Sequence, residues 1–117
     1  MLIEKAMHLN PLHPEIFHDD LARALFGARR YGAALRVLRE SPEPTFYYHV
    51  WMAACLVHLG DLVAARAAVG KALEFAPDFT ISRFAAMEPI RDPLDLAHWT
   101  DALRLAGLSA LVRLFRL

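Results

Sequence analysis

Histidine is the first side chain to consider for chemistry in this sequence, with six copies among 117 residues. His8, His13 and His18 are five residues apart, and no HxxxH or HExxH pair sets two imidazoles on one helical face. We therefore expect no metal and no other cofactor. The histidines are interpreted as surface residues or as hydrogen-bonded members of the core.

Other reactive groups are not arranged for catalysis either. Asp19 and Asp20 are adjacent, so on a helix their carboxylates point about 100° apart, and in a first turn they favour the helix dipole. Cys55 could reach His58 three residues on, but the apolar stretch around it supplies no activating charge and no oxyanion donors. The glycines between residues 27 and 32 lack the lysine and hydroxyl of a phosphate loop. We expect no enzymatic activity from this chain.

Composition narrows the class of partner. The formal net charge is zero, with 56% hydrophobic and 22% charged residues, so electrostatics do not favour nucleic acid or an anionic membrane surface. A neutral module of this kind more often binds protein. The single cysteine, Cys55, cannot form an internal disulfide, and the chain does not start with a secretory signal, which predicts a cytoplasmic protein.

The stretch 46–60 contains no Asp, Glu, Lys or Arg. It is shorter than the roughly 20 apolar residues that cross a bilayer, and histidines interrupt it. It therefore predicts a helix buried on most sides within a soluble fold, without membrane insertion.

Local signals divide the chain into helices. Pro14 suits a first turn, Thr45 and Asp61 can cap, and Gly60 and Gly107 can end a helix. The predicted helices are 2–9, 14–28, 31–40, 46–59, 62–75, 80–87, 93 to 105 or 106, and 108–117. Because no run alternates like a strand, the predicted class is all-α.

A pattern of small residues recurs at an offset of 31 residues along the chain. Tyr31, Ala34, Leu35 and Leu38 take the places of Leu62, Ala65, Arg66 and Val69, and the spacing from Ala6 to Pro11 repeats that from Ala72 to Pro77. A period near 34 residues, with small side chains where two helices must touch, is typical of helical-hairpin repeats.

These residues resemble the tetratricopeptide repeat (TPR) over about residues 1 to 77. The second hairpin matches the repeat's places at Ala53, Leu56, Gly60, Leu62, Ala65, Ala72 and Pro77, and the first hairpin matches at Leu21, Ala22, Leu25, Tyr31 and Ala34. The first hairpin departs at Arg29, which replaces the turn glycine, and at Ser41, which predicts a shortened second helix. The resemblance implies a right-handed α-solenoid of stacked hairpins with capping helices at the C-terminus.

The resemblance also implies a division of the single domain. Residues 1–12 would end a preceding repeat, 13–44 and 45–77 would form two repeats, and 78–117 would form irregular capping helices. On this interpretation the chain would be cut from a longer protein, and its apolar ends would favour self-association or burial in that parent.

The whole chain is similar to the C-terminal repeat region of bacterial adenylate/guanylate cyclase-like proteins. The similarity is carried by the repeats followed in order by Asp78-Phe79, Arg91-Asp92-Pro93 and the helix end Leu105-Ala106-Gly107-Leu108. It implies a module that regulates, localises or oligomerises a catalytic domain outside this chain.

In the repeat, the first helix of each hairpin lines the concave side. The resemblance therefore implies a groove for a protein or peptide partner formed by Asp19, Arg23, Phe26, Tyr47, Val50, Ala54 and His58. The mixture suits a hydrophobic or mixed peptide, and it lacks the lysines and asparagines with which chaperone-binding members hold a C-terminal carboxylate. The alternative is a structural cap or a homodimerisation element with no peptide in the groove.

Overall fold

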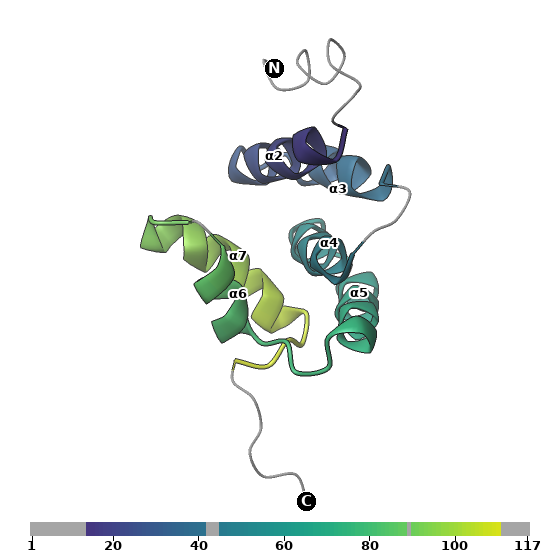
Figure 1. The fold of residues 1–117 in the computed structure, drawn as a ribbon, viewed down its shortest axis with the longest axis vertical. Helices are drawn as coiled ribbons and strands as arrows, with labels where there is room; N and C mark the ends of the chain where they lie inside the picture. Colours follow the sequence, from purple (N-terminus) through teal and green to yellow (C-terminus); the bar gives the residue numbers. More distant parts are fainter. Residues whose placement is uncertain (1–13, 42–44, 89, 111–117) are drawn as a thin grey trace, which may run out of the picture.

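Six α-helices and no strand make up the part of the chain that the structure, a computed structural model, describes: residues 14–41, 45–88 and 90–110. The helices are α2 (Pro14–Gly27), α3 (Tyr31–Arg39), α4 (Phe46–His58), α5 (Leu62–Phe75), α6 (Ile81–Met87) and α7 (Pro93–Leu105) (Figure 1). The all-α prediction is confirmed for these residues, and for the six described helices the predicted bounds differ from the observed ones by at most one residue. The predicted helix 2–9 lies outside the described residues.

Two of the connections follow the same backbone path. The amide of Arg30 donates to the carbonyl of Leu25 at 2.8 Å, and the amide of Asp61 donates to that of Leu56 at 2.9 Å. Before each donor stands a residue with a left-handed backbone, Arg29 with φ 65° and Gly60 with φ 86°. The α2–α3 and α4–α5 hairpins therefore turn in the same way, 31 positions apart in the sequence.

Side-chain caps start three of the later helices. Asp61 accepts a hydrogen bond from the amide of Ala64 at 3.0 Å, as predicted, and Thr80 and Asp92 cap α6 and α7 in the same manner. The predicted cap at Thr45 is wrong. Thr45 occupies the N-cap position of α4, but its hydroxyl makes no capping bond, so α4 is held by the packing of its sides.

Helix α4 is the centre of the fold. It packs against α3, α5 and α7, and Figure 1 places it between α5 on one side and α6–α7 on the other. Residues 50–56 are all buried, which covers every side of the helix over nearly two turns. This is the structural reason that the stretch 46–60 carries no Asp, Glu, Lys or Arg.

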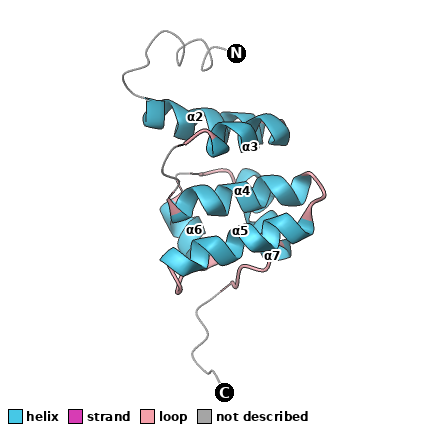
Figure 2. Cartoon of the chain, turned by 90° about the vertical axis from the view of Figure 1, so that its right-hand side faces the viewer, coloured by secondary structure: helices cyan, strands magenta, loops and turns pink. Residues whose placement is uncertain are grey.

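Small residues are buried at equivalent places in the two hairpins. Ala34 in α3 and Ala65 in α5, which are equivalent in the sequence pattern, are both fully buried. Figure 2 shows the α2–α3 pair at one end, followed by α4 and then α5. The predicted shortening of the second helix of the first hairpin is confirmed, since α3 has 9 residues and α5 has 14.

The segment after α5 does not extend this order of helices. Helices α6 and α7 pack against each other, and α7 packs on α4 (Figure 1). The amides of Ile81 and Ser82 donate to the carbonyls of Ser109 and Ala110 at 2.9 and 3.1 Å. The chain after α7 therefore supplies the acceptors for the first amides of α6. The described residues 108–110 of the predicted helix 108–117 are not helical, and the rest of it lies outside the described residues.

Some apolar residues at or near the helix ends are exposed. Leu59 and Ala28 lie beside the two left-handed turns, at the end of the hairpins, where no described helix covers them. On α5, Leu62, Val63 and Phe75 are also exposed, with 81% of the Val63 surface accessible. The fold therefore leaves apolar side chains along one helix of the second hairpin.

Candidate interaction groove

Several of the predicted groove residues are contacted by side chains of α7 and of the segment after α6 in the same chain. We define the α2–α4 groove as the surface formed by Arg23 and Phe26 of α2 with Tyr47, Val50, Ala54 and His58 of α4. Of these, Phe26, Val50 and Ala54 are buried, Arg23 and Tyr47 are half-buried, and His58 is exposed. The side chain of Asp19, the seventh predicted residue, lies outside the described part.

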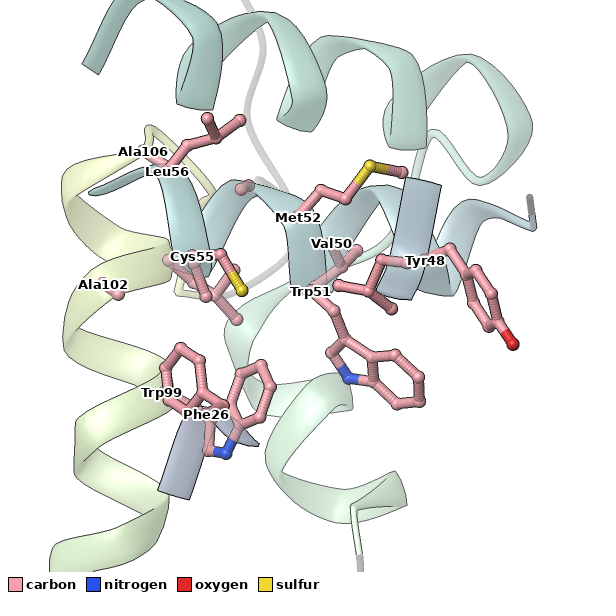
Figure 3. Packing of buried hydrophobic residues seen from close by; sticks show 14 of the residues in the cluster. Phe26, Tyr48, Val50, Trp51, Met52, Cys55, Leu56, Trp99, Ala102 and Ala106 are labelled. Atoms are coloured by element: carbon pink, nitrogen blue, oxygen red, sulfur yellow. The ribbon is translucent and has the colours of Figure 1, made fainter. Parts of the chain in front are cut away.

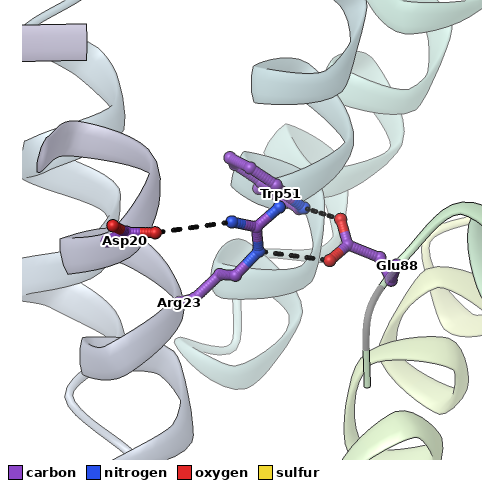
Figure 4. A network of polar contacts seen from close by, with 4 residues as sticks. All are labelled: Asp20, Arg23, Trp51 and Glu88. Atoms are coloured by element: carbon purple, nitrogen blue, oxygen red, sulfur yellow. Dashed lines mark hydrogen bonds and ion pairs between the residues drawn. The ribbon is translucent and has the colours of Figure 1, made fainter. Parts of the chain in front are cut away.

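A carboxylate from the segment after α6 occupies one end of the groove. Glu88 Oε2 accepts from Arg23 Nε at 3.2 Å, and Glu88 Oε1 accepts from Trp51 Nε1 at 3.2 Å (Figure 4). The Glu88 side chain is only 2% exposed, so its charge is compensated almost entirely by these groove donors.

Arg23 connects three elements at this point. Its guanidinium lies 4.8 Å from the centre of the Trp51 ring, and its Nη1 is 3.9 Å from Asp20 Oδ1 one turn earlier on α2. The cation is thus held by a ring face, a surface acid and the buried Glu88 (Figure 4). The repeat resemblance predicted that Arg23 binds an external partner, whereas in this fold it binds Glu88 of the same chain.

Tyr47 contributes a third polar contact to the same carboxylate. Burial raises the pKa of Tyr47 to about 12, and the negative charge of Glu88 and a hydrogen bond with it act in the same direction. The ring of Tyr47 also lies against Phe84 of α6, with 6.3 Å between ring centroids. The hydroxyl therefore stays protonated and able to donate at neutral pH.

An aromatic contact fills the middle of the groove. The Phe26 ring stacks on the Trp99 indole of α7, with 3.6 Å between centroids and 17° between planes, and both residues are buried (Figure 3). The ring centroids of Trp51 and Trp99 are 6.3 Å apart. The apolar part of the groove is thus occupied by α7.

A second polar cluster stands where α2, α3, α4 and α7 meet. The hydroxyl of Tyr31 lies 2.7 Å from Nε2 of His98, and the Tyr31 ring is stacked on His58. The guanidinium of Arg29 also contacts the His98 ring nitrogens. Arginine can only donate, so this contact requires an unprotonated nitrogen on His98.

The surroundings of His98 favour its neutral form. Burial lowers the pKa of His98 to about 4, with further lowering by the charges of Arg29 and His58, while Asp95 opposes the shift. At neutral pH the imidazole is therefore uncharged, with one ring nitrogen able to accept a hydrogen bond and the other able to donate one.

A shallow cavity of about 370 Å³ opens beside the first turn of α7. It is lined by Arg23, Gly27, Ile90, Arg91, Asp92, Asp95, His98 and Trp99. Its two arginines and two aspartates balance, so its charge selects neither an anion nor a cation. Among the described residues, no three His, Cys, Asp or Glu side chains are grouped in a way that could hold a metal ion.

The residues that fill the groove were missed as site residues by the sequence analysis. Trp99 and Glu88 were not among the predicted groove residues, and the histidines, His98 included, were interpreted as surface or core residues. Glu88 carried the clearest signal, as a lone acid in the otherwise apolar run from Phe84 to Ile90. An isolated charge in such a run suggests a buried partner.

Comparison with known proteins adds no relative. No protein-family model, no curated protein and no solved structure matches this chain. None of the helices in the described ranges is both long and apolar enough to cross a membrane.

Proposed function

We propose that this chain is a protein-interaction and scaffold module of the tetratricopeptide-repeat type, without a catalytic role of its own. The support is the equivalence of the two hairpins. Arg29 and Gly60 share a left-handed backbone, and Ala34 and Ala65 share full burial. Equivalent backbone paths at equivalent sequence positions are what repeated hairpins require.

We further propose that the module is a regulatory or oligomerisation region of a larger, cyclase-like protein. The order of motifs after residue 77 supports this proposal, and the structure gives those motifs local roles. Asp92 caps α7, Pro93 is its first residue, and Gly107 ends it with φ 97°. A catalytic domain, on this proposal, lies outside the chain.

The single observation that carries the interaction role is the convergence of α2 and α4 on one surface. Arg23, Tyr47 and Trp51 direct polar groups toward one carboxylate, and Phe26 offers a ring face beside them. Such a surface combines a polar anchor with an aromatic platform, which is the chemistry of interaction hot spots.

Partner capture tests this role. The full chain would be used as bait in lysate from its source, alongside Arg23→Ala and Tyr47→Ala variants whose helicity is checked by circular dichroism. We expect both variants to retain at least tenfold less of an identified partner, while Lys71→Ala on exposed α5 behaves like the parent. Equal capture by all four chains would reject the groove as the binding site.

The second candidate is a structural cap or homodimerisation element. It is favoured by a specific observation, namely that α7 already covers Phe26 while Leu62, Val63 and Phe75 of α5 are exposed. Light scattering over a wide concentration range separates the two. A dimer mass that persists on dilution supports the assembly role, and a monomer at every concentration contradicts it.

A further inference from the structure

We infer that the α6–α7 segment is an internal ligand of the α2–α4 groove, and that the external partner presents an acidic residue and a large aromatic residue about one helical turn apart. This inference rests on the proposed interaction role. It adds the chemical class of the partner and the means by which the groove is closed.

The acid is specified by the donors that surround Glu88. Arg23, Trp51 and Tyr47 come from α2 and α4, and all three direct polar groups to that carboxylate. Without an acceptor, these donors would lose hydrogen bonds to a charged group in a largely buried place, which is costly. An amide or a hydroxyl cannot replace the charge that Arg23 neutralises, so the groove selects a carboxylate.

The aromatic residue is specified by Phe26. Its ring is fully buried and stacks on the Trp99 indole. The His98 ring of the same helix is tilted against it at 4.4 Å between centroids, and Tyr31 and His58 make edge-type contacts with it. A planar ring of similar size restores this stacking, whereas an aliphatic side chain covers only part of it. Tryptophan is therefore the best-matched group.

The spacing follows from Trp51, which lies next to both Glu88 and Trp99. Its Nε1 donates to Glu88 at 3.2 Å, and its ring lies 6.3 Å from Trp99. The two subsites are therefore neighbours. Side chains three or four residues apart on one helix are separated by roughly 5–6 Å at Cβ, so a single helical turn can fill both subsites.

The internal ligand is covalently tethered to α5, so it can leave the groove without leaving the molecule. It is joined to α5 through a turn in which the amide of Phe79 donates to Ala76 at 3.0 Å, and Pro77 and Asp78 of that turn are exposed. Helix α6 has seven residues, and its first amides are satisfied by Ser109 and Ala110 rather than by α5. A tethered ligand acts at an effective concentration of the order of millimolar, so an outside partner competes poorly until the internal contacts weaken.

The test uses a helical, alanine-based synthetic peptide with Glu and Trp four residues apart, titrated into the full chain while the Trp51 indole N–H resonance is followed. We expect the Glu88→Ala chain to bind this peptide at least tenfold more tightly than the parent chain. A peptide with Gln for Glu should bind Glu88→Ala at least tenfold more weakly, and adding Arg23→Ala should abolish the gain. Glu74→Ala, on exposed α5, is the control and should match the parent.

Two results overturn the inference: equal affinity of the parent and Glu88→Ala chains for the peptide, or equal affinity of the Glu and Gln peptides for Glu88→Ala. If Glu88→Ala does not fold, Trp99→Leu replaces it, with the same expected gain over the parent. Hydrogen exchange of the parent supplies a check without mutation. The amides of α6 and α7 should exchange together and before those of α4, and exchange of all three at one common rate contradicts a separable ligand.

The outcome is independent of the search for a natural partner. Peptide binding with no captured protein would reject the proposed function and keep the groove chemistry. Capture of a partner that depends on Arg23, together with a peptide that does not bind, would support the proposed function and reject the inferred groove chemistry.

Discussion

The Phe26 ring of α2 lies face to face with the Trp99 indole of α7, at 3.6 Å between centroids. One residue belongs to the first described helix and the other to the last, so this contact closes the fold across almost its whole described length (Figure 3). It also closes the groove, because Trp99 already covers the Phe26 ring that an outside partner would contact.

Replacing Trp99 with alanine should destabilise the chain by about 3 to 5 kcal/mol, since a large buried ring is lost and Phe26 is left beside a cavity. Urea unfolding followed by circular dichroism gives the free energy of unfolding. Leu94→Ala on the same helix is the control, because Leu94 is 81% exposed, and it should change that value by less than about 0.5 kcal/mol. Similar losses for both would show that Trp99 does not pack as described.

Glu88→Ala should cost about 2 to 3 kcal/mol, because Trp51 and Tyr47 lose their acceptor while the one-third exposed Arg23 can turn to water. Glu88→Gln should cost less, since it keeps an acceptor for the indole. Thermal unfolding compares the stability losses of the Glu88→Ala and Glu88→Gln chains. Glu74→Gln, whose 3.5 Å ion pair with Lys71 is exposed, should have almost no effect.

Stability should fall as the pH is lowered from about 6.5 toward 4. The pKa of His98 is lowered from 6.5 to about 4 in the fold, so in this window the unfolded chain takes up a proton that the folded chain does not. Burial lowers the pKa of His49 as well, and the charge of Lys71 adds to this. Protonation of His49 in the unfolded chain therefore also lowers the stability as the pH falls.

Urea unfolding at several pH values measures this fall, and His98→Gln should reduce it by removing one of the two titrating groups. An NMR titration of the imidazole provides the direct check. A His98 pKa near its ordinary value in the folded chain would contradict the contacts with Arg29 and Tyr31.

Arg29→Gly should raise the pKa of His98, because it removes the nearest positive charge from the imidazole. It should also relieve a left-handed backbone at a non-glycine residue, worth about 1 kcal/mol, which offsets the lost side-chain contact. The matched change in the other hairpin is Gly60→Ala, at φ 86°, which should cost about 1 kcal/mol. A stability loss for Arg29→Gly as large as that for Gly60→Ala would contradict the relief of backbone strain at Arg29.

Local signals in the sequence determined most of the helices. Proline at a first turn, aspartate at a cap and glycine after a last turn act over three or four residues, so Pro14, Asp61 and Gly107 set helix ends wherever the helices lie in space. The absence of charge from 46–60 likewise predicted a buried helix, since an uncharged stretch of this length must be covered on every side.

Tertiary structure alone decided what covers the groove. Periodicity shows which face of a helix is apolar, but several apolar faces compete for each surface, and the choice depends on contacts between residues far apart in the chain. Nothing in the sequence indicated Trp99 as the partner of Phe26, and the repeat resemblance assigned Arg23 to an outside ligand. The fold paired Arg23 with Glu88 because a buried carboxylate must meet its donors inside the same molecule, and only the three-dimensional path of the chain brings them together.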